Sequence, residues 1–115
     1  MKKIEAIIRP EKLDAVKDAL SAKGMLGMTV THVSGRGRQK GIALQWRAGE
    51  YRVDFLPKVK IEIVLADEEC PVALDIICVA ARTGREGDGM IFVLPVENAM
   101  RVRTNDNGDT CITGK

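Results

Sequence analysis

Two glycine-rich segments and one pair of arginines are the parts of this 115-residue sequence whose residue types suit anion binding. The first segment, residues 35–41, follows a predicted strand and places cationic side chains between glycines. Its spacing, Gly-x-Gly-x-x-x-Gly, is one residue longer than a dinucleotide fingerprint, and no apolar helix follows to place its N-terminus at a pyrophosphate. We therefore exclude a Rossmann site. Two interpretations remain equally open. The segment is either an exposed backbone with cationic side chains nearby, which suits an anion, or a solvated turn.

The second glycine-rich segment, Thr83-Gly-Arg-Glu-Gly-Asp-Gly89, joins a predicted helix to a predicted strand. Glycine adopts positive φ and lets a backbone approach a ligand closely. Successive amides in such a turn can form a concave site for an anion. A helix C-cap at Gly84 followed by a tight turn is the alternative, and the segment alone favours that alternative.

Arg101 and Arg103 form the arginine pair. In an extended segment side chains alternate, so these two guanidinium groups are expected on the same side. Arginine can grip a phosphate with two parallel hydrogen bonds. An ordinary solvated edge is the alternative interpretation.

The sequence offers no arrangement of nucleophile, base and orienting group. The single histidine, His32, lies in a predicted strand and is expected to pack rather than to act as a base or as a phosphorylated nucleophile. The acidic run of residues 67–69 suits the start of a helix, where carboxylates interact well with the helix dipole. We predict a protein that is not an enzyme and carries no prosthetic group.

The three cysteines, Cys70, Cys78 and Cys111, fit no metal-ligand spacing. If Cys70 and Cys78 lie on one helix, their α-carbons are ~12 Å apart at ~1.5 Å rise per residue. A disulfide requires less than ~7 Å. Reduced thiols in a reducing compartment are expected.

Charge is distributed unevenly along the chain. The formal net charge is +2, whereas residues 36–60 carry +5 and the remainder carries −3. This pattern predicts a local anion site or a docking surface rather than a nucleic-acid-binding protein. The first residues contain too short an apolar stretch for a signal peptide, and no run approaches the ~20 apolar residues of a membrane span. We expect a cytoplasmic protein.

Hydrophobic periodicity predicts one α+β domain over residues 1–115. Its order is βαβ, a long loop, and βαβ, which is typical of a ferredoxin-like βαββαβ sandwich. Pro10 suits the start of the first helix. We expect strands at 2–9, 27–35, 56–66 and 91–94, helices at 11–23 and 67–82, a loop at about 37–55, a short return segment at 97–104 and a polar tail at about 105–115. The expected inward residues are Leu13, Val16 and Leu20, then Val59, Ile61, Ile63 and Leu65, then Val72, Ile76, Ile77 and Ala80.

Blocks of residues along nearly the whole chain resemble the PII family of nitrogen-regulatory proteins, from Met1 to about Thr104. The segment 50–62, Glu-Tyr-Arg-Val-Asp-Phe-Leu-Pro-Lys-Val-Lys-Ile-Glu, is the most specific of them and resembles the return from the family's T-loop. The other matching blocks are residues 2–10, 27–31, 37–41, 83–93 and 101–104.

The resemblance implies a homotrimeric regulator that binds ATP or ADP in clefts between subunits. It implies a nucleotide site made of Ile7, Thr29, Gly35, Gly37, Arg38, Val64, Gly87, Asp88, Gly89, Met90, Arg101 and Arg103. It also implies that Gln39 helps to hold Mg²⁺ and 2-oxoglutarate, that Lys58 pairs with a carboxylate of 2-oxoglutarate, and that Tyr51 corresponds to a tyrosine that is uridylylated in some members.

The resemblance further implies partners among nitrogen-metabolism proteins, such as an ammonium transporter or glutamine synthetase, with a membrane met only through the transporter. Two features depart from the family pattern. The loop reads Trp-Arg-Ala-Gly-Glu-Tyr over residues 46–51, whereas the family has tyrosine first and glycine before alanine. Met90 stands where the family usually has a lysine that reaches the nucleotide phosphates.

Other classes of function remain open. One is a ferredoxin-like nucleotide-binding module or phosphotransferase unrelated to nitrogen control, which would use His32. Another is an RNA-binding module, which stacks bases on aromatic residues of a sheet. The predicted strands offer only Phe92 for such stacking, so RNA binding is the weakest alternative.

Overall fold

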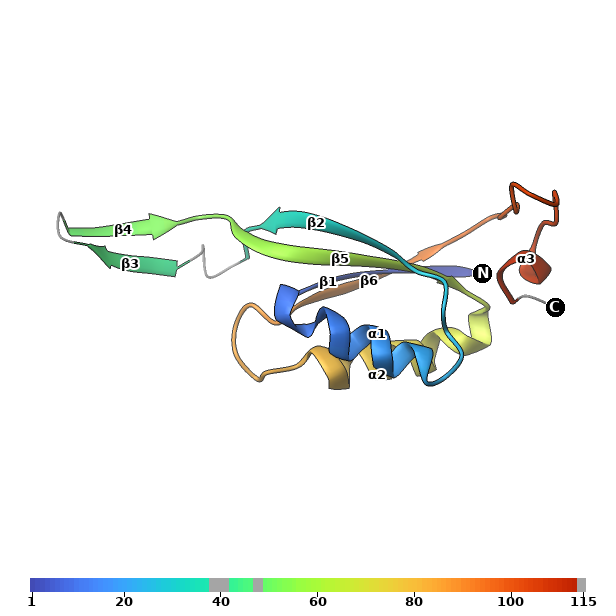
Figure 1. Ribbon diagram of the computed structural model, residues 1–115, viewed down its shortest axis with the longest axis horizontal. Coiled ribbons are helices and arrows are strands. Elements are labelled where there is room, and N and C mark those ends of the chain that lie inside the picture. The colour runs from blue at the N-terminus through green and yellow to red at the C-terminus, as the bar shows by residue number, and fades with distance from the viewer. Residues whose placement is uncertain (38–41, 47–48, 114–115) are drawn as a thin grey trace.

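The computed structural model describes residues 1–37, 42–46 and 49–113, with side chains for 1–37 and 54–112. It forms an α+β fold (Figure 1). In chain order its strands are β1 (Lys2–Ile8), β2 (Thr29–Gly35), β3 (Ile42–Trp46), β4 (Gly49–Val53), β5 (Leu56–Leu65) and β6 (Gly89–Pro95). Its helices are α1 (Leu13–Ser21), α2 (Cys70–Ala81) and α3 (Asp109–Thr113), with 3-10 turns at Pro10–Lys12 and Asp67–Glu69.

Four of the strands form one antiparallel sheet in the order β2-β5-β1-β6. This order brings the first and last strands of the sheet together, with Ile8 opposite Gly89. Helices α1 and α2 lie together on one face of the sheet (Figure 1). The predicted ferredoxin-like fold is confirmed.

The core lies between the sheet and the two helices. The predicted alternation along β5 is confirmed, because Val59, Ile61, Ile63 and Leu65 are buried. They pack with Ile4, Ala6 and Ile8 of β1 and with Val16 and Leu20 of α1, as one cluster. Pro10 stands in the turn that begins the first helix, where its missing N–H costs nothing.

The predicted inward face of α2 is only partly right. Ile77 is buried, and Ile76 and Ala80 pack partly buried against the core, as expected. The buried companions of Ile77 are Cys70, Ala73 and Ala81, however, and Val72 is 46% exposed. Asp75 is the only charged residue of this helix. An apolar pattern around most of a helix gives no periodicity from which the buried face can be found.

Residues 37–55 contain more regular structure than the predicted loop. Strands β3 and β4 pair antiparallel, with Trp46 opposite Gly49, and Figure 1 shows this hairpin beyond the end of the main sheet. Its alternation is too short to stand out in the sequence. The side chain of Tyr51 lies outside the described residues.

The C-terminal segment also folds instead of running on as a tail. Met100 and Asn107 form an isolated bridge, and Cys111 of α3 is buried. Across the described part of the chain, no helix combines the length and the hydropathy that crossing a membrane requires.

Candidate functional site

The glycine turn of residues 83–89, which joins α2 to β6, is organised by the carboxylate of Asp88. This carboxylate accepts hydrogen bonds from the Thr83 hydroxyl, from the Thr83 amide at 2.7 Å and from the Gly84 amide at 2.9 Å. The Thr83 oxygen in turn accepts from the Arg85 amide at 3.2 Å. The segment is therefore a closed loop built around one side chain.

These hydrogen bonds favour the ionised form of Asp88. The Thr83 hydroxyl makes the largest contribution, followed by the amides of Thr83 and Gly84 and by Arg9, and together they hold the pKa of the Asp88 carboxyl far below its ordinary value. Asp88 is thus a fixed negative charge at neutral pH.

Three glycines of this turn have backbone conformations that other residues rarely adopt. Gly84 has φ +88°, Gly87 has φ +94° and Gly89 has φ +119°. A Cβ at Gly89 would lie 1.9 Å from the Ile7 carbonyl oxygen. The turn therefore lies directly against β1. The predicted site residues Ile7, Gly89 and Met90 lie together here, and Met90 stands opposite Ile7 and is 62% exposed.

Lys58 reaches the same turn from β5. Its Nζ donates to the Gly87 carbonyl oxygen at 2.5 Å. Partial burial, with a smaller contribution from the neighbouring Arg9 charge, lowers the pKa of the Lys58 ammonium. Gly35 lies beside it, since a Cβ at Gly35 would be 3.2 Å from Lys58 Cγ. This end of the sheet, which we call the turn end, thus gathers Ile7, Gly35, Lys58 and the glycine turn.

The turn end also offers backbone donors. Among the described residues, none accepts a hydrogen bond from the amide of Glu86 or Gly87. Successive amides without partners are the ordinary basis of an anion-binding nest.

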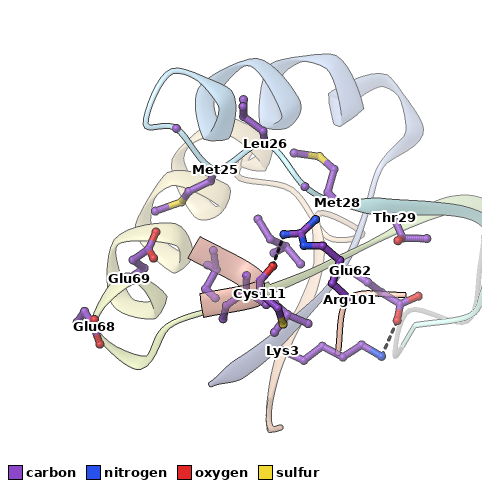
Figure 2. A pocket seen from close by; sticks show the side chains of 16 residues that line it. Lys3, Met25, Leu26, Met28, Thr29, Glu62, Glu68, Glu69, Arg101 and Cys111 are labelled. Atoms are coloured by element: carbon purple, nitrogen blue, oxygen red, sulfur yellow. Dashed lines mark hydrogen bonds and ion pairs between the residues drawn. The ribbon is translucent and has the colours of Figure 1, made fainter. Parts of the chain in front are cut away.

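A pocket of about 930 Å³ occupies the other end of the sheet (Figure 2). Three predicted site residues line it, namely Thr29, Val64 and Arg101. It also contains residues that the sequence analysis did not assign: Lys3, Met25, Gly27, Met28, Glu62, Ile63, Cys111 and Ile112. Several of these flank Thr29 or Val64 in the sequence, which is the signal by which they could have been found.

Arg101 does not lie in an extended segment, and this prediction was wrong. Its amide donates to Asp106 O and its carbonyl accepts from the Asn105 amide, each at 2.8 Å, so the chain turns here. Asn105 has φ +62°, a conformation that asparagine tolerates. Arg101 points into the pocket and donates to the Cys111 carbonyl oxygen (Figure 2), whereas Arg103 is exposed and does not line the pocket.

Lys3 and Glu62, which line this pocket, belong to a network of ion pairs. Lys3 Nζ lies 2.6 Å from Glu62 Oε2 and 3.2 Å from Glu5 Oε1 (Figure 2 shows the first pair). Lys60 lies 3.9 Å from Glu62 on its other side. The hydrogen bond from Lys3 lowers the pKa of Glu62, and the bonds to Glu62 and then Glu5 raise the pKa of Lys3.

The predicted nucleotide and 2-oxoglutarate residues therefore fall into two groups within one chain. Lys58 and Val64 both belong to β5, and six residues at ~3.3 Å each separate them by about 20 Å. Gly37 is exposed just beyond β2, while Arg38 and Gln39 lie outside the described residues. Over the described part of the chain, no group of three or more His, Cys, Asp or Glu side chains could hold a metal ion.

His32 and the three cysteines are the remaining residues that the sequence singled out. His32 is exposed on β2, so the expectation that it packs in the core was wrong. Cys70 and Cys78 lie on one helix as predicted, and all three cysteines are free thiols, with Cys78 exposed.

Comparisons with known proteins agree with the sequence resemblance. The family described as nitrogen regulatory protein P-II matches residues 1–106. The chain is 55% identical over 112 residues to a nitrogen regulatory protein P-II of Cereibacter sphaeroides, covering 97% of this chain and 100% of the relative. It is 59% identical over 108 residues to that of Bradyrhizobium diazoefficiens, covering 94% and 96%. The chain belongs to the nitrogen regulatory protein P-II family.

Proposed function

We propose that this protein senses adenine nucleotide and 2-oxoglutarate and regulates nitrogen-metabolism proteins through the segment 37–55. Its relatives are named as regulatory proteins, not as enzymes. The observation that carries the proposal is the division of the site residues between the glycine turn and the pocket at the other end of the sheet. In this proposal the glycine turn binds the phosphates of the nucleotide, and the pocket binds its base and ribose.

The turn end suits the phosphates. The amides of Glu86 and Gly87 have no described acceptor, and glycine at 87 and 89 leaves the backbone open to close approach. In this proposal Asp88 acts through the turn that its carboxylate organises.

The pocket suits the base and ribose. Its walls carry apolar groups such as Ile63, Val64 and Met28 beside the polar side chains of Thr29 and Glu62. Apolar walls with a few placed polar groups are the usual form of a small-molecule site, and in this pocket polar and apolar surface contribute about equally.

Assembly of three copies would unite the two groups. Within one chain Arg101 lies at the pocket end, so it can meet a phosphate at a glycine turn only if that turn belongs to another copy. The face of the sheet opposite the helices carries Phe92 at 48% and Leu94 at 39% exposure, which supports its burial between subunits. The nucleotide sites then lie between subunits of a homotrimer.

The ligand 2-oxoglutarate would bind beside the phosphates. Lys58 offers the cation for one carboxylate, and Gln39 together with Mg²⁺ and the ATP phosphates would hold the other end. A loop whose conformation depends on the ligand can then engage different targets, an ammonium transporter or glutamine synthetase among them. Such a ligand shifts the loop only by its differential affinity for the two loop states.

Calorimetric titration with ATP, ADP and AMP, combined with sedimentation equilibrium, tests the proposal. We expect ATP and ADP to bind a trimer at one site per subunit. Incubation with labelled ATP should leave no stable phosphohistidine at His32. A monomer that binds no nucleotide contradicts the proposal, and labelling of His32 supports a phosphotransferase instead.

A further inference from the structure

Arg9 makes two contacts with the glycine turn, although it is 79 positions away from Asp88 in the sequence. Its Nε donates to Asp88 Oδ1 at 3.0 Å. Its Nη2 donates to the Glu86 carbonyl oxygen at 2.6 Å. The side chains of Arg9 and Asp88 are 22% and 24% exposed, so the pair is largely withdrawn from solvent. Among the described side chains, only Arg9 and Lys58 reach this turn from outside residues 83–88.

The two cations hold two consecutive carbonyl groups of the turn. Arg9 holds that of Glu86 and Lys58 holds that of Gly87. In a trans peptide the carbonyl and the following N–H point in opposite directions. Cations that fix these carbonyls therefore direct the amides of Gly87 and Asp88 to the other side, where no described residue accepts from the Gly87 amide.

We propose that Arg9 is a positioning residue for phosphate binding, and this inference rests on the proposed function. Arg9 does not touch the phosphate. It fixes the Glu86 carbonyl and the Asp88 carboxylate at once, and so aligns the amides before the anion arrives. A guanidinium group does this because its nitrogens form a rigid fork, whereas a lysine ammonium is a single point of charge.

The test compares Arg9→Gln with Arg82→Gln in titrations with AMP, ADP and ATP. Arg82 is an exposed arginine directly after α2, and it makes no hydrogen bond from its side chain within the described residues. In Arg9→Gln the ATP affinity should fall roughly ten- to a hundred-fold, as for one lost charge-assisted contact. The loss should be smaller for ADP and smallest for AMP. Arg82→Gln should bind all three like the wild type.

A general loss of structure would lower the three affinities by the same factor, and that result overturns the inference. Unchanged binding by Arg9→Gln also overturns it. If Arg9→Gln does not fold, Arg9→Lys replaces it, because lysine keeps the charge but cannot hold both Asp88 and Glu86. Its ATP affinity should fall more than its AMP affinity, and wild-type affinity for both contradicts the role of Arg9. A wild type that binds no nucleotide contradicts the proposed function itself.

Discussion

The backbone of Gly89 lies against the carbonyl of Ile7 so closely that no side chain fits between them. A Cβ built at Gly89 would lie 1.9 Å from the Ile7 oxygen and 3.1 Å from the Ile8 α-carbon. Gly89 also has φ +119°, which L side chains rarely adopt. This contact seats the glycine turn on β1 and thereby fixes where the turn meets the rest of the sheet.

We expect Gly89→Ala to destabilise the protein by about 2–5 kcal/mol. The unfavourable φ accounts for about 1–2 kcal/mol, and the clash with β1 for about 1–3 kcal/mol, as for overpacking. Gly84→Ala is the matched control, because Gly84 has φ +88° but open space around it, and it should lose only about 1–2 kcal/mol. Urea unfolding measures the free energy of unfolding of both variants. Equal losses would show that the clash between a Cβ at position 89 and Ile7 adds nothing.

Asp88→Asn should lower stability at neutral pH and should lower it less in acid. The folded-state pKa of Asp88 lies far below the ordinary value of 3.8, so the ionised carboxyl stabilises the fold above that pH. This contribution is lost as the pH falls below 3.8 toward the folded pKa. The difference in unfolding free energy between wild type and variant should therefore shrink from pH 7 to pH 3.

The control for this pH dependence is Asp75→Asn, at an exposed carboxylate of α2 that pairs with no described residue. Its stability should differ from wild type by a constant, small amount. If the difference in unfolding free energy between wild type and Asp88→Asn stays constant with pH, the ionised Asp88 carboxylate does not stabilise the glycine turn.

The fold was largely predictable, and the reasons are visible in particular residues. The alternation of Val59, Ile61 and Ile63 placed β5 correctly, because one face of that strand is buried and the other is not. The inward face of α2 was not predictable, because a helix apolar on most sides has no distinctive stripe. The turn at Asn105 was missed because a single residue with positive φ reverses the chain.

The site was predictable only in part. Thr29, Val64 and Arg101 line one pocket, and Ile7, Gly87 and Gly89 gather at the turn end. Arg9 could not be found from the turn itself, because its contact with Asp88 depends on the pairing of the first and last strands of the sheet. That pairing sets Ile8 opposite Gly89, and so brings the residue after β1 to the turn before β6.

Lys58→Met should weaken 2-oxoglutarate binding about tenfold or more, because a charge-assisted bond contributes about 1.5–3 kcal/mol. Nucleotide binding in the absence of 2-oxoglutarate should change less, since Arg9 still holds the turn. Lys60→Met is the matched control, because Lys60 stands on the same face of β5 but pairs with Glu62 instead of the turn. Calorimetry that finds equal losses for both ligands in Lys58→Met would indicate a damaged strand.

Met90→Lys should raise the affinity for ATP about tenfold or more and affect ADP less. Met90 is exposed beside Ile7 and the glycine turn, where a thioether cannot donate to a phosphate. Val79→Lys adds the same charge at an exposed position of α2 and should change neither affinity. Unchanged binding of both nucleotides by Met90→Lys would show that position 90 only packs at the start of β6.

The most direct test of joint sensing is a calorimetric titration of 2-oxoglutarate into the protein with and without Mg-ATP. In the proposed shared site Lys58 and Gln39 would lie beside the ATP phosphates and Mg²⁺, so 2-oxoglutarate would need the nucleotide to complete its contacts. We predict saturable binding of 2-oxoglutarate in the presence of Mg-ATP and little or no heat in its absence. Equal affinity under both conditions would contradict the shared site.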